Sequence, residues 1–165
     1  MSHPSVHART QPDKIAYLMA GSGQGITYAE LDARSNQGAQ LFRSLGLKAG
    51  DHIAFLMENR LEFMEICWAA QRAGLYYTAI SRYLTADEIG YIVGDCGAKL
   101  VITSPKGAEV IAPLITDAPD TLFFLLDEKR NGFRDWKAAL DAQPATPIAD
   151  EVAGYDMLYS SGTTG

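Results

Sequence analysis

Six consecutive small residues at the end of the sequence have the types and spacing that could bind phosphate: Ser160, Ser161, Gly162, Thr163, Thr164 and Gly165. Glycine lets a backbone approach a ligand closely, and successive N–H groups can form a concave nest for an anion. Hydroxyl groups add hydrogen-bond donors without bulk. The same composition is also typical of a disordered Ser/Thr/Gly terminus. Composition alone does not decide between the two.

Two better-known glycine loops do not fit the sequence. A Walker A loop requires a Gly-Lys pair before Ser or Thr, and the terminal stretch has none. The cluster Gly21-Ser22-Gly23-Gln24-Gly25 looks like a dinucleotide fingerprint, but its third glycine would have to stand at Ile26, where no long helix opens. We therefore interpret residues 21–25 as a hairpin turn between a strand and a short second strand.

The helices and strands that must position the terminal loop are predicted from the spacing of apolar residues and from helix-capping motifs. Residues 155–159 predict a short strand, so the loop would leave a strand end, where α/β folds place their ligands. Thr27 with Glu30 and Thr85 with Glu88 form capping boxes, and Asn59 with Glu62 follows the same spacing. These three starts predict helices over about residues 27–45, over about residues 60–73, and from residue 85 onward. Two short helices are predicted over residues 107–114 and 136–140.

Strands are predicted between these helices, over residues 14–20, 51–57, 75–80, 99–103 and 121–126. Most are apolar on both faces, which is typical of a parallel sheet covered on two sides. The sequence predicts an α/β fold, a mostly parallel sheet with helices on both faces. We divide it into a polar lead-in (1–12), an α/β body (13–142), a surface linker (143–154), and a strand with the start of the loop (155–165).

Composition excludes several classes of protein. The net charge of −6 disfavours nucleic acid and anionic membranes as main partners. No signal peptide or run of about 20 apolar residues is present, and Cys67 and Cys96 lie in apolar helical patterns, so we expect a cytoplasmic protein without a membrane span. His3, His7 and His52 lack partners at ligand spacing, so no metal site is predicted.

Four stretches, in order, resemble the adenylate-forming superfamily of acyl-CoA synthetases, luciferases and peptide-synthetase adenylation domains. They are ITYAELDARSNQGAQLFRSLGLKAGD, IAFLMENRLEFMEICWAAQRAG, LTADEIGYIVGDCGAKLVITS and the terminal YSSGTTG, which resembles the family's phosphate loop. The resemblance covers about residues 13–165. It implies the N-terminal subdomain of the acyl-CoA synthetase fold.

The resemblance implies an AMP-forming acid–thiol ligase. A carboxylic acid, ATP with Mg²⁺, and coenzyme A would be its partners, and Ser160, Ser161, Gly162, Thr163, Thr164 and Gly165 would contact the β- and γ-phosphates. Tyr159 would anchor the preceding strand. Residues 79–85 lack the Pro and Asp of peptide-synthetase domains. This favours an acyl-CoA synthetase with a fatty or related acid as substrate.

The family's pattern continues beyond Gly165 with a Pro-Lys-Gly segment, the acyl pocket and a catalytic lysine, so we expect an inactive N-terminal fragment, truncated within the loop, that has no catalytic residue of its own. One alternative is an adenylation enzyme with another acyl acceptor. The other is a stand-alone, non-catalytic interaction domain that would expose apolar patches. Each of these three hypotheses allows the protein to form a homo-oligomer.

Overall fold

The computed structural model describes residues 3–159. Its central feature is a six-stranded parallel sheet in the order β7-β6-β5-β3-β4-β8. The strands are β3 (His52–Leu56), β4 (Tyr76–Ala79), β5 (Ala98–Thr103), β6 (Leu122–Leu125), β7 (Arg134–Asp135) and β8 (Tyr155–Asp156). All five pairings are parallel. The predicted α/β fold with a mostly parallel sheet is confirmed.

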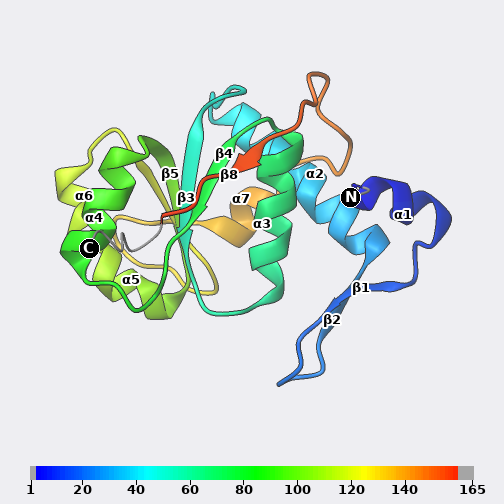
Figure 1. Ribbon diagram of the computed structural model, residues 1–165, viewed down its shortest axis with the longest axis horizontal. Coiled ribbons are helices and arrows are strands. Elements are labelled where there is room, and N and C mark those ends of the chain that lie inside the picture. The colour runs from blue at the N-terminus through cyan, green and yellow to red at the C-terminus, as the bar shows by residue number, and fades with distance from the viewer. Residues whose placement is uncertain (1–2, 160–165) are drawn as a thin grey trace, which may run out of the picture.

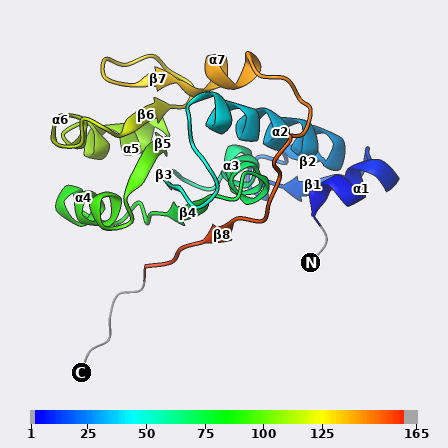
Figure 2. The same cartoon turned by 90° about the horizontal axis from the view of Figure 1, so that it is seen from above.

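Helices cover both faces of this sheet (Figures 1 and 2). One face carries α2 (Tyr28–Ser44), α3 (Leu61–Arg72) and α7 (Trp136–Asp141), and the other carries α4 (Ala86–Asp95), α5 (Pro105–Ile111) and α6 (Leu114–Asp117). Successive residues of a strand point to opposite faces, so Ile53 and Phe55 join the first core while Ala54 and Leu56 join the second. Both cysteines are buried in these cores, as predicted.

The N-terminal part lies outside the sheet. Helix α1 (Pro4–Thr10) packs on α2, and strands β1 (Ile15–Leu18) and β2 (Gly25–Thr27) form a separate antiparallel hairpin that extends away from the body (Figure 1). The hairpin predicted around residues 21–25 is confirmed. A hydrogen bond of 3.0 Å from Trp68 Nε1 to the Tyr17 hydroxyl ties the hairpin to α3.

Both capping boxes are confirmed at the starts of α2 and α4. The Thr27 side chain accepts from the backbone of Glu30, whose carboxylate accepts from the backbone of Thr27, and Thr85 with Glu88 repeats the arrangement. The prediction for α3 is wrong at its start. Arg60, not Asn59, is the N-cap residue and makes no side-chain capping bond. The Glu62 carboxylate instead accepts two bonds from the Arg60 guanidinium.

The helix predicted over residues 107–114 is also wrong in its bounds. Helix α5 begins earlier, at Pro105, and ends at Ile111, and a separate helix, α6, starts at Leu114 after Pro113. Proline is favoured in the first turn of a helix, where its missing N–H is not needed. The same residue type inside a helix removes a hydrogen bond, and this accounts for the break at Pro113.

Candidate phosphate-binding site

The chain enters the predicted phosphate loop from the edge strand β8. This strand pairs in parallel with β4, with Tyr155 beside Tyr76 and Asp156 beside Tyr77. The backbone N–H of Tyr155 donates to Leu75 O at 3.0 Å, and that of Met157 donates to Tyr77 O at 2.9 Å. The predicted site residues Ser160, Ser161, Gly162, Thr163, Thr164 and Gly165 lie outside the described residues. The structure therefore describes the segment that leads to residues 160–165, up to Tyr159.

Gly154 allows β8 to reach its place beside β4. A Cβ atom at this position would lie 2.4 Å from Leu75 O, 2.7 Å from Ala70 O and 2.8 Å from Leu75 N. The backbone of Gly154 also donates to Gln71 O at 2.6 Å. Only glycine fits so close to a neighbouring backbone. Gly154 lies in the segment 143–154 that the sequence predicts as a surface linker, and this close approach to the sheet was not predicted.

Tyr159, the last described residue, turns towards α4. Its hydroxyl donates to Asp95 Oδ2 at 2.6 Å, and its ring packs against the apolar core beneath α4. The Asp95 carboxylate that accepts this bond raises the pKa of the Tyr159 hydroxyl. The phenol is therefore a stable donor at neutral pH. That Tyr159 anchors the preceding strand stays a prediction, and the contact with Asp95 on α4 was not predicted from the sequence.

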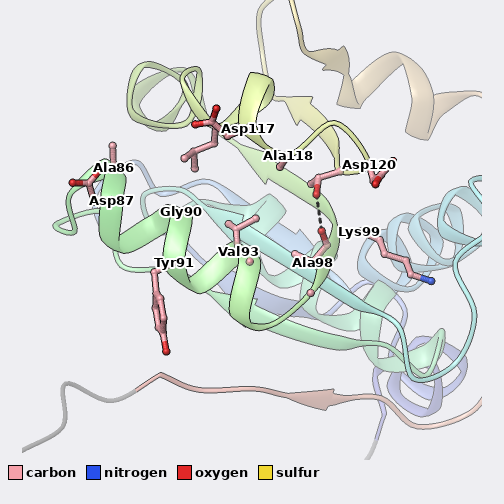
Figure 3. Close-up of a pocket in the computed structure, with 14 residues that line it drawn as sticks. Ala86, Asp87, Gly90, Tyr91, Val93, Ala98, Lys99, Asp117, Ala118 and Asp120 are labelled. Atoms are coloured by element: carbon pink, nitrogen blue, oxygen red, sulfur yellow. Dashed lines mark hydrogen bonds between the residues drawn. The ribbon is translucent and has the colours of Figure 1, made fainter.

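Helix α4 separates two cavities. One, of about 690 Å³, lies beside β4 and is lined by Thr78, Ile80, Leu84, Ile92 and Tyr159 among others. The second, of about 700 Å³, lies between α4 and α6, and Figure 3 shows Asp117 and Asp120 on its far side from α4. Both cavities have Asp87 and Tyr91 in their walls. The only charged residues lining the first cavity are the carboxylates Asp87 and Glu88, so its described walls supply no cationic group for phosphate.

A charged cluster at the carboxyl ends of β3, β5 and β6 was also missed by the sequence analysis. Ser104 Oγ donates to Glu58 Oε2 at 2.6 Å, while Arg60 pairs with Glu62 and with Asp127, both at 2.8 Å. Asp127 has a left-handed backbone, with φ of 64°. Arg60 is the one cation among the three carboxylates Glu58, Glu62 and Asp127, so this cluster keeps a net negative charge and offers no unpaired cationic group for phosphate. We therefore assign it to holding the strand ends together.

Both cysteines of the described chain, Cys67 and Cys96, are buried free thiols. Burial raises the pKa of Cys67 to about 12, so this thiol stays protonated at neutral pH. Within the described residues, no group of three or more His, Cys, Asp or Glu side chains is arranged to hold a metal ion. Among residues 3–159, no helix combines the length and apolar character that a membrane crossing requires.

Glu65 on α3 is the carboxyl whose pKa is most raised, to about 7, first by burial and then by the nearby Glu62 carboxylate. Helix α3 covers the face of the sheet opposite Tyr159. A raised pKa means that the folded state favours the protonated form. Stability from this group is therefore complete below pH 4.5, its ordinary pKa, and is lost as the pH rises through 7.

Glu65→Gln is expected to remove this loss. At pH 8 the variant should be more stable than the wild type by about 1–3 kcal/mol, and the difference should vanish below about pH 4.5. Urea unfolding between pH 4 and 8 measures it. The matched control is Glu109→Gln, at an exposed position on α5, which should leave the pH dependence unchanged. Equal pH profiles for Glu65→Gln and the wild type would contradict the assignment.

Comparison with known proteins identifies the family. Residues 5–165 match the AMP-binding enzyme family. The chain is 32% identical to the long-chain-fatty-acid–CoA ligase FadD13 of Mycobacterium tuberculosis, covering 96% of this chain and 31% of the relative. It is 30% identical to the fatty acid–[acyl-carrier-protein] ligase ScoC of Streptomyces coeruleorubidus, covering 98% of this chain and 30% of the relative. The chain thus spans about a third of the length of these relatives.

Solved structures agree with the fold. The inhibitor-bound N-terminal domain of FACL13 from Mycobacterium tuberculosis superimposes with a TM-score of 0.84 at 28% identity, over 99% of this chain and 41% of that one. The anthranilate CoA ligase AuaEII superimposes with a TM-score of 0.87 at 21% identity, over 100% of this chain and 33% of that one, a likeness of fold alone. Since the family match extends through the terminal Ser/Thr/Gly stretch, the chain belongs to the AMP-binding enzyme family.

Proposed function

We propose that the chain is the N-terminal part of an ATP-dependent acyl-CoA synthetase acting on a fatty or related acid. In this reaction a carboxylate attacks the α-phosphate of ATP and displaces pyrophosphate, and the acyl group then passes to the thiol of coenzyme A. The observation that carries the proposal is the family match from residue 5 to residue 165. The identity of 32% to a long-chain-fatty-acid–CoA ligase supports the choice of substrate class.

We propose that Ser160, Ser161, Gly162, Thr163, Thr164 and Gly165 contact the β- and γ-phosphates of ATP. The donor set fits this ligand, because it combines hydroxyl groups and backbone N–H groups with no carboxylate. Fixed donors around the leaving pyrophosphate would stabilise its developing charge. Mg²⁺, when bound, would neutralise phosphate charge, and its ligands are expected outside this chain.

The division of the chain supports the same proposal. We propose residues 13–142 as the α/β body, 143–154 as the linker and 155–165 as the strand and loop, after a lead-in of residues 1–12. The linker is held along α2, since Gln40 Nε2 donates to Thr146 O at 2.9 Å and Arg43 pairs with Asp150 at 3.0 Å. These contacts direct the chain from α7 to the far edge of the sheet, where β8 begins.

The intact mass of the native gene product should be measured first, because the relatives are about three times as long as this chain. The full product should then be tested for carboxylate-dependent exchange of pyrophosphate into ATP, with short to long fatty acids and aromatic acids. Thr163→Ala should weaken the exchange, whereas Thr10→Ala, an exposed hydroxyl on α1, should not. The absence of exchange with every acid would overturn the proposal.

A carrier-protein thiol is the second candidate acceptor, and the identity of 30% to the acyl-carrier-protein ligase ScoC favours it. Adenylation is common to both candidates, so pyrophosphate exchange does not separate them. Acyl transfer to coenzyme A should be compared with transfer to a phosphopantetheinyl carrier protein at equal thiol concentrations. If the acyl group passes to the carrier protein and not to coenzyme A, the carrier protein replaces coenzyme A as the proposed acceptor.

A further inference from the structure

Tyr159 occupies a particular place in the chain, between the last strand and the first residue of the proposed phosphate loop. Its hydroxyl donates to Asp95 Oδ2 at 2.6 Å. Asp95 is the last residue of α4, and 64 positions separate the two residues in the sequence. The hydrogen bond therefore links the end of a helix directly to the residue before Ser160.

Few other contacts fix this stretch. Strand β8 has two residues, and the last backbone bond from it to the sheet runs from Met157 N to Tyr77 O at 2.9 Å. Leu158 is 77% exposed, so its side chain adds little packing. The ring of Tyr159 touches the core beneath α4 on one side and borders the 690 Å³ cavity. The hydrogen bond to Asp95 adds a polar contact to this one-sided packing of the ring.

We propose that the hydrogen bond between Tyr159 and Asp95 positions the phosphate loop, so that these two residues act as positioning residues for the phosphates of ATP. The inference rests on the proposed function. It assigns a role in that function to Asp95 on α4 and to Tyr159 after β8. Neither residue would touch the nucleotide. A bond from a neutral phenol to a carboxylate is charge-assisted and stronger than one between neutral groups.

The position of the ring determines where the next peptide unit begins. Because donors must lie within about 0.5 Å of their places to bind an anion well, we expect a shift of Tyr159 to disturb the phosphate contacts proposed for residues 160–165. A role confined to folding would lower stability without a selective effect on ATP. A positioning role therefore predicts a change in the KM for ATP, whereas a role confined to folding does not.

The test uses pyrophosphate exchange by the full-length protein. Tyr159→Phe removes the hydroxyl and keeps the ring, and we expect it to raise the KM for ATP about three- to tenfold, the effect of an ordinary hydrogen bond, because solvent exposure weakens this charge-assisted one. The KM for the acid should stay unchanged. Asp95→Ala should have the same effect, whereas Asp95→Asn should retain most of the wild-type KM, because an amide oxygen can accept from the phenol.

Tyr91→Phe is the matched control. Tyr91 is 68% exposed, lies on the same helix and borders the same cavity, so the loss of its hydroxyl should leave the KM for ATP unchanged. The double variant Tyr159→Phe/Asp95→Ala should be no worse than either single variant, because both remove one interaction. Additive losses would show that the residues act separately and would overturn the proposal.

A second measurement examines the bond without turnover. In a tyrosine NMR titration, the Tyr159 phenol of the wild type should ionise at higher pH than the Tyr159 phenol of the Asp95→Ala variant. A wild type that exchanges pyrophosphate, paired with a Tyr159→Phe variant of unchanged KM for ATP, would overturn the positioning role alone. A wild type that neither binds ATP nor exchanges pyrophosphate would overturn the proposed function and the positioning role with it.

Discussion

Replacement of Arg72 by alanine is expected to lower the free energy of unfolding by about 3 kcal/mol, because it breaks a buried ionic network. The side chain of Arg72 is 1% exposed and pairs with Asp32 at 2.6 Å. It also donates to the side chain of Asn36, which is 2% exposed. The substitution leaves Asn36 Oδ1 and Asp32 Oδ1 without the guanidinium that donates to them. Urea unfolding of the wild type and the variant measures the loss.

Arg34→Ala is the control for this prediction. Arg34 extends from α2, the helix that carries Asp32, and pairs with Asp141 at the same distance of 2.6 Å, but the two side chains are 33% and 42% exposed. Exposed pairs of this kind contribute at most about 1 kcal/mol. Equal losses for Arg72→Ala and Arg34→Ala would show that burial does not set the effect. Arg72→Met keeps the apolar bulk and should isolate the electrostatic part.

Local signals explain why most elements could be predicted from the sequence. The capping boxes at Thr27 and Thr85 involve residues three apart, and nothing distant in the chain competes with them. The same spacing failed at Asn59 because the Glu62 carboxylate is taken by the Arg60 guanidinium. The ion pair between Arg60 and Glu62 thus takes the place of the capping box expected at Asn59. Helix α1 was missed because its sequence, PSVHART, has no clear apolar stripe.

Long-range contacts explain what could not be predicted. The strand order places β3 at the centre and β8 at an edge beside β4, and no pattern within a strand encodes its neighbours. Arg72 meets partners that precede it by 36 and 40 positions. Asp95 and Tyr159 are likewise distant in sequence. The composition of the candidate loop and the strand before it could be found in the sequence, but the partners of that strand and of Tyr159 could not.

Gly154→Val is expected to displace β8 and to lower the free energy of unfolding by about 2–4 kcal/mol, the range typical of severe overpacking. The three atoms nearest to a Cβ at this position all belong to the backbone of Ala70 and Leu75, at 2.4 to 2.8 Å. Backbone atoms cannot rotate away as a side chain can, so strand β8 must move. Urea unfolding measures the stability, and hydrogen exchange of the Tyr155 and Met157 amides reports the position of the strand.

Gly94→Ala is the matched control, since a Cβ at Gly94 would meet nothing within 4 Å and the residue lies inside α4. Alanine favours a helix interior over glycine by about 0.5–1 kcal/mol, so this variant should be as stable as the wild type or more so. Because β8 leads to Tyr159, Gly154→Val should also weaken ATP binding by the full-length protein, whereas Gly94→Ala should not. Unchanged protection of the Tyr155 and Met157 amides in Gly154→Val would mean that the sheet edge tolerates a side chain, and that glycine is not what places this strand beside β4.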